Sequence, residues 1–252
     1  MIAQVRADGG EGRSVVYLPG IDGSGDLLLG TADALVSSFR LLRLCYEDAA
    51  DVDASYASLA AGVAATLRER GATPALLLAE SFGGAVALRV ALDHPDVARC
   101  AVLVNTFPYY SRRLSLAISR LGAAVVPRPL FEVSRQAFGP AILFAGRRER
   151  DAIARFRRLR LSGFDRAYRR RLAMIAALDL RPELARLSLP VRIVAGSWDL
   201  VVDSVRQARS MERRLQRARL EVVPRGGHLL LPLAQLDWPR RLHEVLAEAD
   251  RT

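Results

Sequence analysis

The sequence predicts an α/β fold in which a mostly parallel, doubly wound sheet carries a helical cap between its fourth and fifth predicted strands. Three observations predict it. Short apolar runs alternate with segments of helical periodicity, these runs are apolar throughout, and the alternation stops between residues 107 and 187. The chain has 252 residues, of which 51% are hydrophobic, and is therefore long enough for one sizeable core.

The predicted strands are short runs of β-branched and aliphatic residues, at positions 14–18, 41–45, 75–79, 100–104, 191–195 and 220–223. The predicted helices occupy residues 26–39, 55–70, 82–92, 205–217 and 233–249. In the second of these helices, Leu59, Val63 and Leu67 recur at helical spacing, and Gly71 ends the pattern. Strands that are apolar along their whole length indicate a sheet with helices on both faces, which favours parallel strands.

Residues 107–187 interrupt this order with helical patterning and several prolines. We interpret them as a cap or lid over the strand ends, so residues 1–106 and 188–252 would form the core domain. Apolar residues of this segment either line an acyl pocket or form the interior of the cap; both interpretations stay open for Leu114, Leu116, Ile118, Leu121, Val125, Val126, Leu130 and Phe131.

The charge of the chain is concentrated in one segment. The net charge is +10, and all the basic residues are arginines. Arg147–Arg171 holds eleven arginines and three acidic residues, an excess of eight positive charges. A solvated helical face is the simplest interpretation, and weak contact with an acidic surface is the alternative. Nucleic acid is not expected as a partner, because the rest of the chain is nearly neutral. The oligomeric state is not predicted.

Two further patterns concern location and thiol chemistry. Residues 1–12 carry charges and lack the apolar core of a secretion signal, and no uninterrupted apolar run reaches 18 residues, so we expect a cytoplasmic protein. Cys45 and Cys100 lie in apolar, strand-like runs. We expect buried free thiols there, with no disulfide and no metal.

Ser81 is the candidate nucleophile. It follows the strand predicted at 75–79 and precedes a long apolar helix, which is the layout of a nucleophile elbow. The sharp turn crowds the backbone, so the residues two before and two after the serine must be small. They are Ala79 and Gly83.

A serine hydroxyl needs a general base, and the base needs an orienting acid. Of three histidines, His94 lies a helix away from Ser81, at about 18 Å, and His243 lies within the last predicted helix. His228 follows the last strand in a glycine loop, at the same sheet edge as Ser81. Asp199 follows the fifth strand and is the candidate acid, with Asp203 as the alternative.

Residues 18–25, Leu-Pro-Gly-Ile-Asp-Gly-Ser-Gly, form a glycine-rich loop after the first core strand. We predict an oxyanion hole made by the backbone N–H groups of Ile21 and Phe82, the latter at the start of the elbow helix. A phosphate-binding P-loop is excluded, because no Gly-Lys-Ser/Thr follows. Residues next to the predicted catalytic and oxyanion groups are candidate substrate contacts: Gly20, Asp22, Trp198, Leu229 and Phe107. For Asp22, a structural role in the turn is the simpler interpretation.

The order Ser81, Asp199, His228 resembles the α/β-hydrolase superfamily over nearly the whole chain, from about Ser14 to Ala249. The loop at residues 18–25 also resembles that of an esterase, lipase and thioesterase branch related to plant phytyl ester synthases. Ala79 departs from the usual glycine of the elbow, and Pro19 stands where this loop usually has histidine.

The resemblance implies a serine hydrolase without a cofactor or a metal. We expect cleavage of a small-molecule carboxylic ester with a short to medium acyl chain, through an acyl-enzyme. The alternatives are an acyltransferase, a thioesterase or a C–C bond hydrolase on the same three residues. A binding protein that kept the fold is disfavoured by the intact serine, histidine and aspartate.

Overall fold

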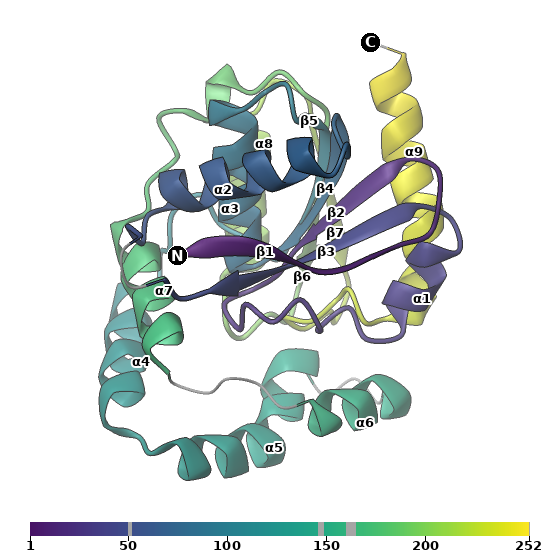
Figure 1. The fold of residues 1–252 in the computed structure, drawn as a ribbon. Helices are drawn as coiled ribbons and strands as arrows, with labels where there is room; N and C mark the ends of the chain where they lie inside the picture. Colours follow the sequence, from purple (N-terminus) through teal and green to yellow (C-terminus); the bar gives the residue numbers. More distant parts are fainter. Residues whose placement is uncertain (50–51, 146–148, 160–164, 252) are drawn as a thin grey trace.

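The computed structural model describes residues 1–49, 52–145, 149–159 and 165–251, and its centre is one sheet (Figure 1). The strands run in the spatial order β1-β3-β2-β4-β5-β6-β7, and all neighbours pair in parallel except β1 with β3. Their bounds are β1 Ile2–Gly9, β2 Ser14–Leu18, β3 Arg40–Glu47, β4 Ala75–Glu80, β5 Ala98–Val104, β6 Val191–Gly196 and β7 Ala218–Val223. The predicted parallel, doubly wound sheet is confirmed.

Helices cover both faces of this sheet, as the apolar strands require. One face packs against α2 (Tyr56–Glu69), α3 (Phe82–Asp93) and α8 (Ser204–Glu212). The other face packs against α1 (Thr31–Val36) and α9 (Trp238–Asp250). Strand β4 shows the consequence: its alternate residues belong to two different cores, yet every one of its side chains is buried.

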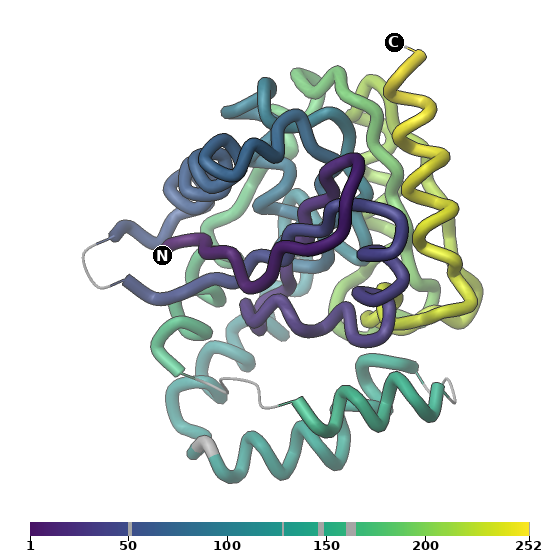
Figure 2. The backbone as a smooth tube through the Cα atoms, turned by 45° about the vertical axis from the view of Figure 1, so that its right-hand side comes forward, coloured from purple at the N-terminus to yellow at the C-terminus, as the bar shows by residue number. Residues whose placement is uncertain are grey.

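Between β5 and β6 the chain forms four helices, α4 (Arg113–Val125), α5 (Arg128–Phe144), α6 (Arg150–Arg158) and α7 (Arg166–Ala177), and a 3₁₀ turn, η1 (Leu184–Arg186). Figures 1 and 2 show α4, α5 and α6 gathered at one end of the molecule. The backbone N–H of Leu229 donates to the carbonyl of Leu143, at 2.9 Å, so α5 lies against the loop that follows β7. The helical patterning of this segment is confirmed; its separation as a cap domain stays a prediction.

The structure differs from the expected elements at three places. Strand β1 was not predicted, because it is a half-exposed edge strand that carries charged residues. The helix expected over 26–39 is wrong except for α1, since Leu29 has a positive φ of 50° and breaks the pattern. The last helix starts later than expected, at Trp238, because Asp237 caps its first turn by accepting from the N–H of Arg240.

Both cysteines are free, and Cys100 is buried whereas Cys45 is partly exposed. Burial raises the pKa of the Cys100 thiol to about 12, so it stays protonated. Among the described residues, no helix combines the length and the apolar character needed to span a bilayer.

Candidate active site

Ser81 occupies the predicted sharp turn between β4 and α3. Its backbone angles, φ 51° and ψ −120°, are strained for a residue with a side chain. The turn leaves no room beside it: a Cβ atom at Gly83 would lie 2.2 Å from the carbonyl oxygen of Leu18, and one at Gly84 would lie 2.2 Å from the hydroxyl of Thr106. Small residues are therefore required after the serine, as the sequence predicted.

The structure brings Ser81, His228 and Asp199 into one hydrogen-bonded line. The distance from Ser81 Oγ to His228 Nε2 is 3.1 Å, and that from His228 Nδ1 to Asp199 Oδ2 is 2.8 Å. A carboxylate only accepts, so Nδ1 carries the proton, and Nε2 is left to accept from the serine hydroxyl. The other two histidines lie elsewhere: His94 ends α3, and His243 on α9 stacks against Phe39 at 4.5 Å.

The Asp199 carboxylate is held in place by the loop that carries it. Its Oδ1 accepts from the backbone N–H groups of Val201 and Val202, at 2.8 and 3.0 Å, and its Oδ2 accepts from the Ser204 hydroxyl. The alternative acid, Asp203, lies 3.9 Å from Arg206 instead. Geometry therefore favours Asp199 as the partner of the histidine.

The pKa values of Asp199 and His228 shift in opposite directions because the two side chains face each other. Burial raises the pKa of Asp199, but the facing His228 and the hydrogen bonds outweigh it, so the pKa ends below its usual value. Burial lowers the pKa of His228, yet the Asp199 carboxylate and the nearby Glu80 raise it above its ordinary value. Asp199 is thus ionised at neutral pH, and its negative charge favours the protonated form of the facing imidazole.

Asn105 and Thr106, which directly follow β5, join the site's loops. The Asn105 amide donates to the carbonyls of Gly227 and His228, both at 2.8 Å, and accepts from the N–H of Gly196 at 2.7 Å. The Thr106 hydroxyl donates to the carbonyl of Ser81 at 2.6 Å. The sequence reading missed both residues. Their signal was available: polar residues that directly follow an apolar strand lie at the edge where site residues gather.

The glycine-rich loop after β2 lies beside the serine. A Cβ atom at Gly20 would be 3.7 Å from Ser81 Cβ, and Gly20 and Ile21 line the same cavity as Ser81. The N–H of Phe82, at the first position of α3, has no acceptor within its helix. Both predicted oxyanion donors are therefore next to Ser81.

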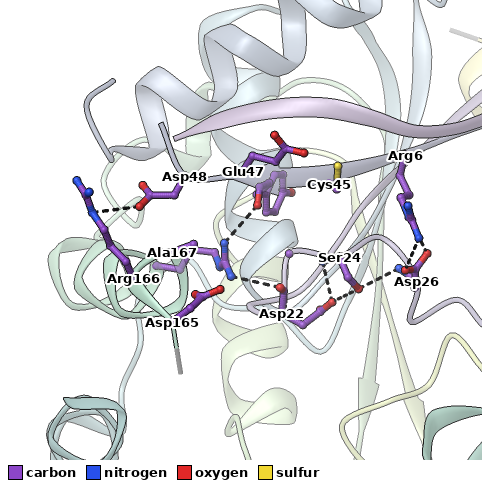
Figure 3. A pocket seen from close by; sticks show the side chains of 13 residues that line it. Arg6, Asp22, Ser24, Asp26, Cys45, Glu47, Asp48, Asp165, Arg166 and Ala167 are labelled. Carbon is purple, nitrogen blue, oxygen red and sulfur yellow. Dashed lines mark hydrogen bonds and ion pairs between the residues drawn. The ribbon is translucent and has the colours of Figure 1, made fainter. Parts of the chain in front are cut away.

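Arg171 of α7 holds this loop from outside, and the sequence reading missed it. Its side chain is 1% exposed, and its Nε and one terminal nitrogen donate to the carbonyls of Ile21 and Asp22, at 2.7 and 3.2 Å. A second cavity, of about 530 Å³, runs along Asp22 and Ser24, where the Ser24 hydroxyl donates to the Asp22 carboxylate (Figure 3). The structure thus supports the interpretation of Asp22 as a turn residue, although it also borders the Ser81 cavity.

Glu80, the residue before the serine, is a buried carboxyl that the sequence reading did not single out. Its Oε1 accepts from the hydroxyl of Tyr17, and its Oε2 has no partner among the described residues. Burial raises the pKa of Glu80 to about 7. The group lines the Ser81 cavity, so its charge affects His228.

A cavity of about 580 Å³ opens onto Ser81 and His228. Of the predicted contacts, Gly20, Asp22 and Leu229 line it. Phe107 is instead 1% exposed and packs edge-on against Tyr110, and the Trp198 side chain is 53% exposed; neither is among the described residues that line the cavity.

Most of the apolar residues proposed for an acyl pocket lie elsewhere. Phe131 lines the cavity and Leu116 is buried, but exposed side chains belong to Leu114, Ile118, Leu121, Val125 and Leu130. The other apolar wall residues are Phe138 and Ile142, which share the α5 face of Phe131, and Phe156 of α6. Helical periodicity alone did not distinguish the residues that line the cavity from those that do not.

Comparison with known proteins identifies the family of the chain. Residues 10–245 match the model of the alpha/beta hydrolase family. The chain belongs to this family.

A curated relative of this alpha/beta hydrolase is RutD of Klebsiella pneumoniae, a protein named as a proposed carbamate hydrolase. It is 29% identical over 234 residues, which cover 85% of this chain and 84% of the relative. Among solved structures, an enol-lactonase from Burkholderia xenovorans has a TM-score of 0.83 at 20% identity, covering 97% of this chain and 96% of that one. An esterase from Thermogutta terrifontis has a TM-score of 0.81 at 20% identity, covering 98% and 93%. At this identity the two structures show the fold alone.

Proposed function

We propose that this alpha/beta hydrolase cleaves carboxylic esters through an acyl-enzyme on Ser81. The observation that carries the proposal is the line of hydrogen bonds from the Ser81 hydroxyl through His228 to Asp199. A cavity of about 580 Å³ falls within the range of small-molecule sites and fits an ester with a short to medium acyl chain.

In the first half-reaction, Ser81 Oγ attacks the ester carbonyl while His228 Nε2 takes the hydroxyl proton. The carbonyl oxygen becomes an oxyanion, which the N–H groups of Ile21 and Phe82 stabilise. Collapse of this intermediate breaks the carbon–oxygen bond, and His228 returns its proton to the leaving alcohol. Asp199 keeps the imidazole in the required tautomer and stabilises its positive charge throughout.

In the second half-reaction, water takes the place of the serine hydroxyl. His228 accepts a proton from the water as it attacks the acyl-enzyme, and then gives this proton to Ser81 Oγ as the acid leaves. An alcohol or a thiol that entered in place of water would make the same site an acyltransferase. Thioester and C–C bond cleavage are further alternatives, because they need the same nucleophile and base.

The helices α4–α7 would act as the cap in this proposal. They supply one wall of the cavity, through Ser119, Phe131 and Phe138, whereas the nucleophile and the base come from the loops of the sheet. Acyl-chain preference would then depend on the cap, and the reaction on the core.

The test is hydrolysis of p-nitrophenyl esters from acetate to palmitate by the wild type, by Ser81→Ala and by a control, Ser188→Ala, at an exposed residue outside the helices and strands. We expect Ser81→Ala to lose on the order of 10⁴-fold or more in kcat and the control to match the wild type. A phenyl carbamate and a thioester complete the panel, because RutD is named for carbamates. Hydrolysis that survives in Ser81→Ala would contradict the proposal, and turnover of the carbamate or thioester alone would change the substrate class.

A further inference from the structure

Exposed apolar side chains concentrate on two helices of the segment between β5 and β6. On α4, Leu114, Ile118, Leu121 and Val125 recur at helical spacing and are 77%, 63%, 66% and 67% exposed. On α5, Leu130, Val133, Phe138 and Ile142 are also exposed, between 43% and 65%. These eight residues, called here the apolar collar, are two thirds of the twelve exposed large apolar residues in the described part of the chain. Surfaces that face only water rarely gather so many large apolar side chains in one place, so the collar indicates a contact surface.

The apolar collar adjoins the entrance to the Ser81 cavity. Phe138 and Ile142 are exposed and also line the cavity, and Ser119 of α4 lines it too. The exposed Leu200, in the loop after β6, lies next to α4, because Arg112 donates to its carbonyl at 2.7 Å. Figures 1 and 2 place α4, α5 and α6 at the same end of the molecule. Whatever covers the collar therefore lies at the entrance to the cavity.

This end of the molecule is also positively charged. Helices α4, α5 and α6 contain eight arginines and two acidic residues. On α6, Arg150, Arg157 and Arg158 are exposed, while Ala152 and Phe156 are buried against the rest of the protein. Two copies meeting through these helices would bring like charges together, whereas an anionic surface would be attracted.

We propose that the apolar collar docks on an anionic lipid bilayer and that the Ser81 site takes its acyl ester from that bilayer. The proposal rests on the proposed ester hydrolysis. Exposed leucine, isoleucine and phenylalanine side chains insert at the boundary between headgroups and acyl chains, and flanking arginines pair with lipid phosphates. A bilayer fits this position better than a protein partner, because it supplies acyl esters at the entrance that it covers.

The test is co-sedimentation with vesicles of phosphatidylglycerol and phosphatidylcholine, compared with phosphatidylcholine alone. We expect binding to the anionic vesicles that weakens as salt rises. Leu121→Asp/Val125→Asp should reduce this binding roughly tenfold or more, because two apolar side chains no longer insert. The control, Val36→Asp/Val222→Asp, adds the same charge at exposed apolar residues outside the collar and should change binding much less.

Hydrolysis of p-nitrophenyl acetate by these three proteins and by Ser81→Ala, which is also tested for vesicle binding, separates the two proposals. The collar variant should keep the wild-type rate on this soluble ester, and Ser81→Ala should bind vesicles as the wild type does while losing turnover. Failure of the wild type to bind anionic vesicles, or equal binding by both double variants, would overturn the docking proposal and leave ester hydrolysis standing. A wild-type dimer in light scattering that the collar variant converts to a monomer would also overturn it, by making the collar an interface between copies.

Discussion

The sheet and the helix α4 differ in how far their side chains are buried. All six residues of β4 are buried, whereas α4 has 13 residues, of which only Leu116 and Ala123 are buried. The strand has helices on both faces, and α4 packs on one side, mainly against α7. Burial on two sides constrains every residue of the strand, so the loops that carry Ser81, Asp199 and His228 keep fixed positions relative to one another. Burial on one side leaves most of a helix free to contact substrate or another surface.

The largest expected effect concerns the hydrogen-bonded line of Ser81, His228 and Asp199, which lies on loops of the sheet. Asp199→Asn keeps the size of the side chain but removes the charge that orients His228, so we expect kcat for ester hydrolysis to fall on the order of 10⁴-fold. Asp203→Asn is the matched control and should stay near the wild-type rate. A larger loss in Asp203→Asn than in Asp199→Asn would assign the orienting role to Asp203.

The pH dependence of the hydrolysis rate is a second test of the pairing between His228 and Asp199. His228 must be neutral to accept the serine proton, so the rate should rise with pH through a midpoint above the ordinary histidine value of about 6.5. The Asp199 carboxylate holds the pKa of His228 up, so the residual activity of Asp199→Asn should have its midpoint at lower pH. An unchanged midpoint would show that this titration does not belong to His228.

Two glycine substitutions compare the regions by stability. Alanine at Gly83 of α3 would place Cβ 2.2 Å from the Leu18 carbonyl oxygen, so we expect Gly83→Ala to lower the free energy of unfolding by about 3 kcal/mol. Alanine at Gly122 of α4 meets nothing within 4 Å, and Gly122→Ala should raise this free energy by up to about 1 kcal/mol. Denaturant unfolding measures both. Equal destabilisation by the two would show that α4 is packed as tightly as the core.

The smallest effect concerns Arg171, which joins the two regions. Arg171→Met removes the donors to the carbonyls of Ile21 and Asp22. The loop should then move, and the Ile21 N–H should no longer point at the oxyanion. We expect kcat to fall roughly 10- to 100-fold with little change in KM. Arg171→Lys should recover part of the loss by restoring one donor. Arg181→Met, at an exposed residue, is the control. A loss of thermal stability without any change in kcat would assign Arg171 a structural role alone.

The sequence by itself determined the features that local chemistry imposes. Apolar strands alternating with helices predicted the parallel sheet, because only strands covered on both faces are apolar throughout. The small residues around Ser81 predicted the sharp turn that φ 51° now shows. His228 and Asp199 were predicted to meet because the ends of parallel strands share one edge of the sheet.

Only the tertiary structure decided which distant groups touch. Asn105 and Arg171 contact backbone groups 91 to 150 positions away in the sequence, and Glu80 acts on the pKa of His228; no local pattern encodes which groups these side chains meet. The outward orientation of Leu121 and Val125 was equally hidden: helical spacing shows that a helix has an apolar face, but not whether that face meets protein or solvent. Local propensity depends on neighbours along the chain, whereas packing depends on every element that folds against a residue.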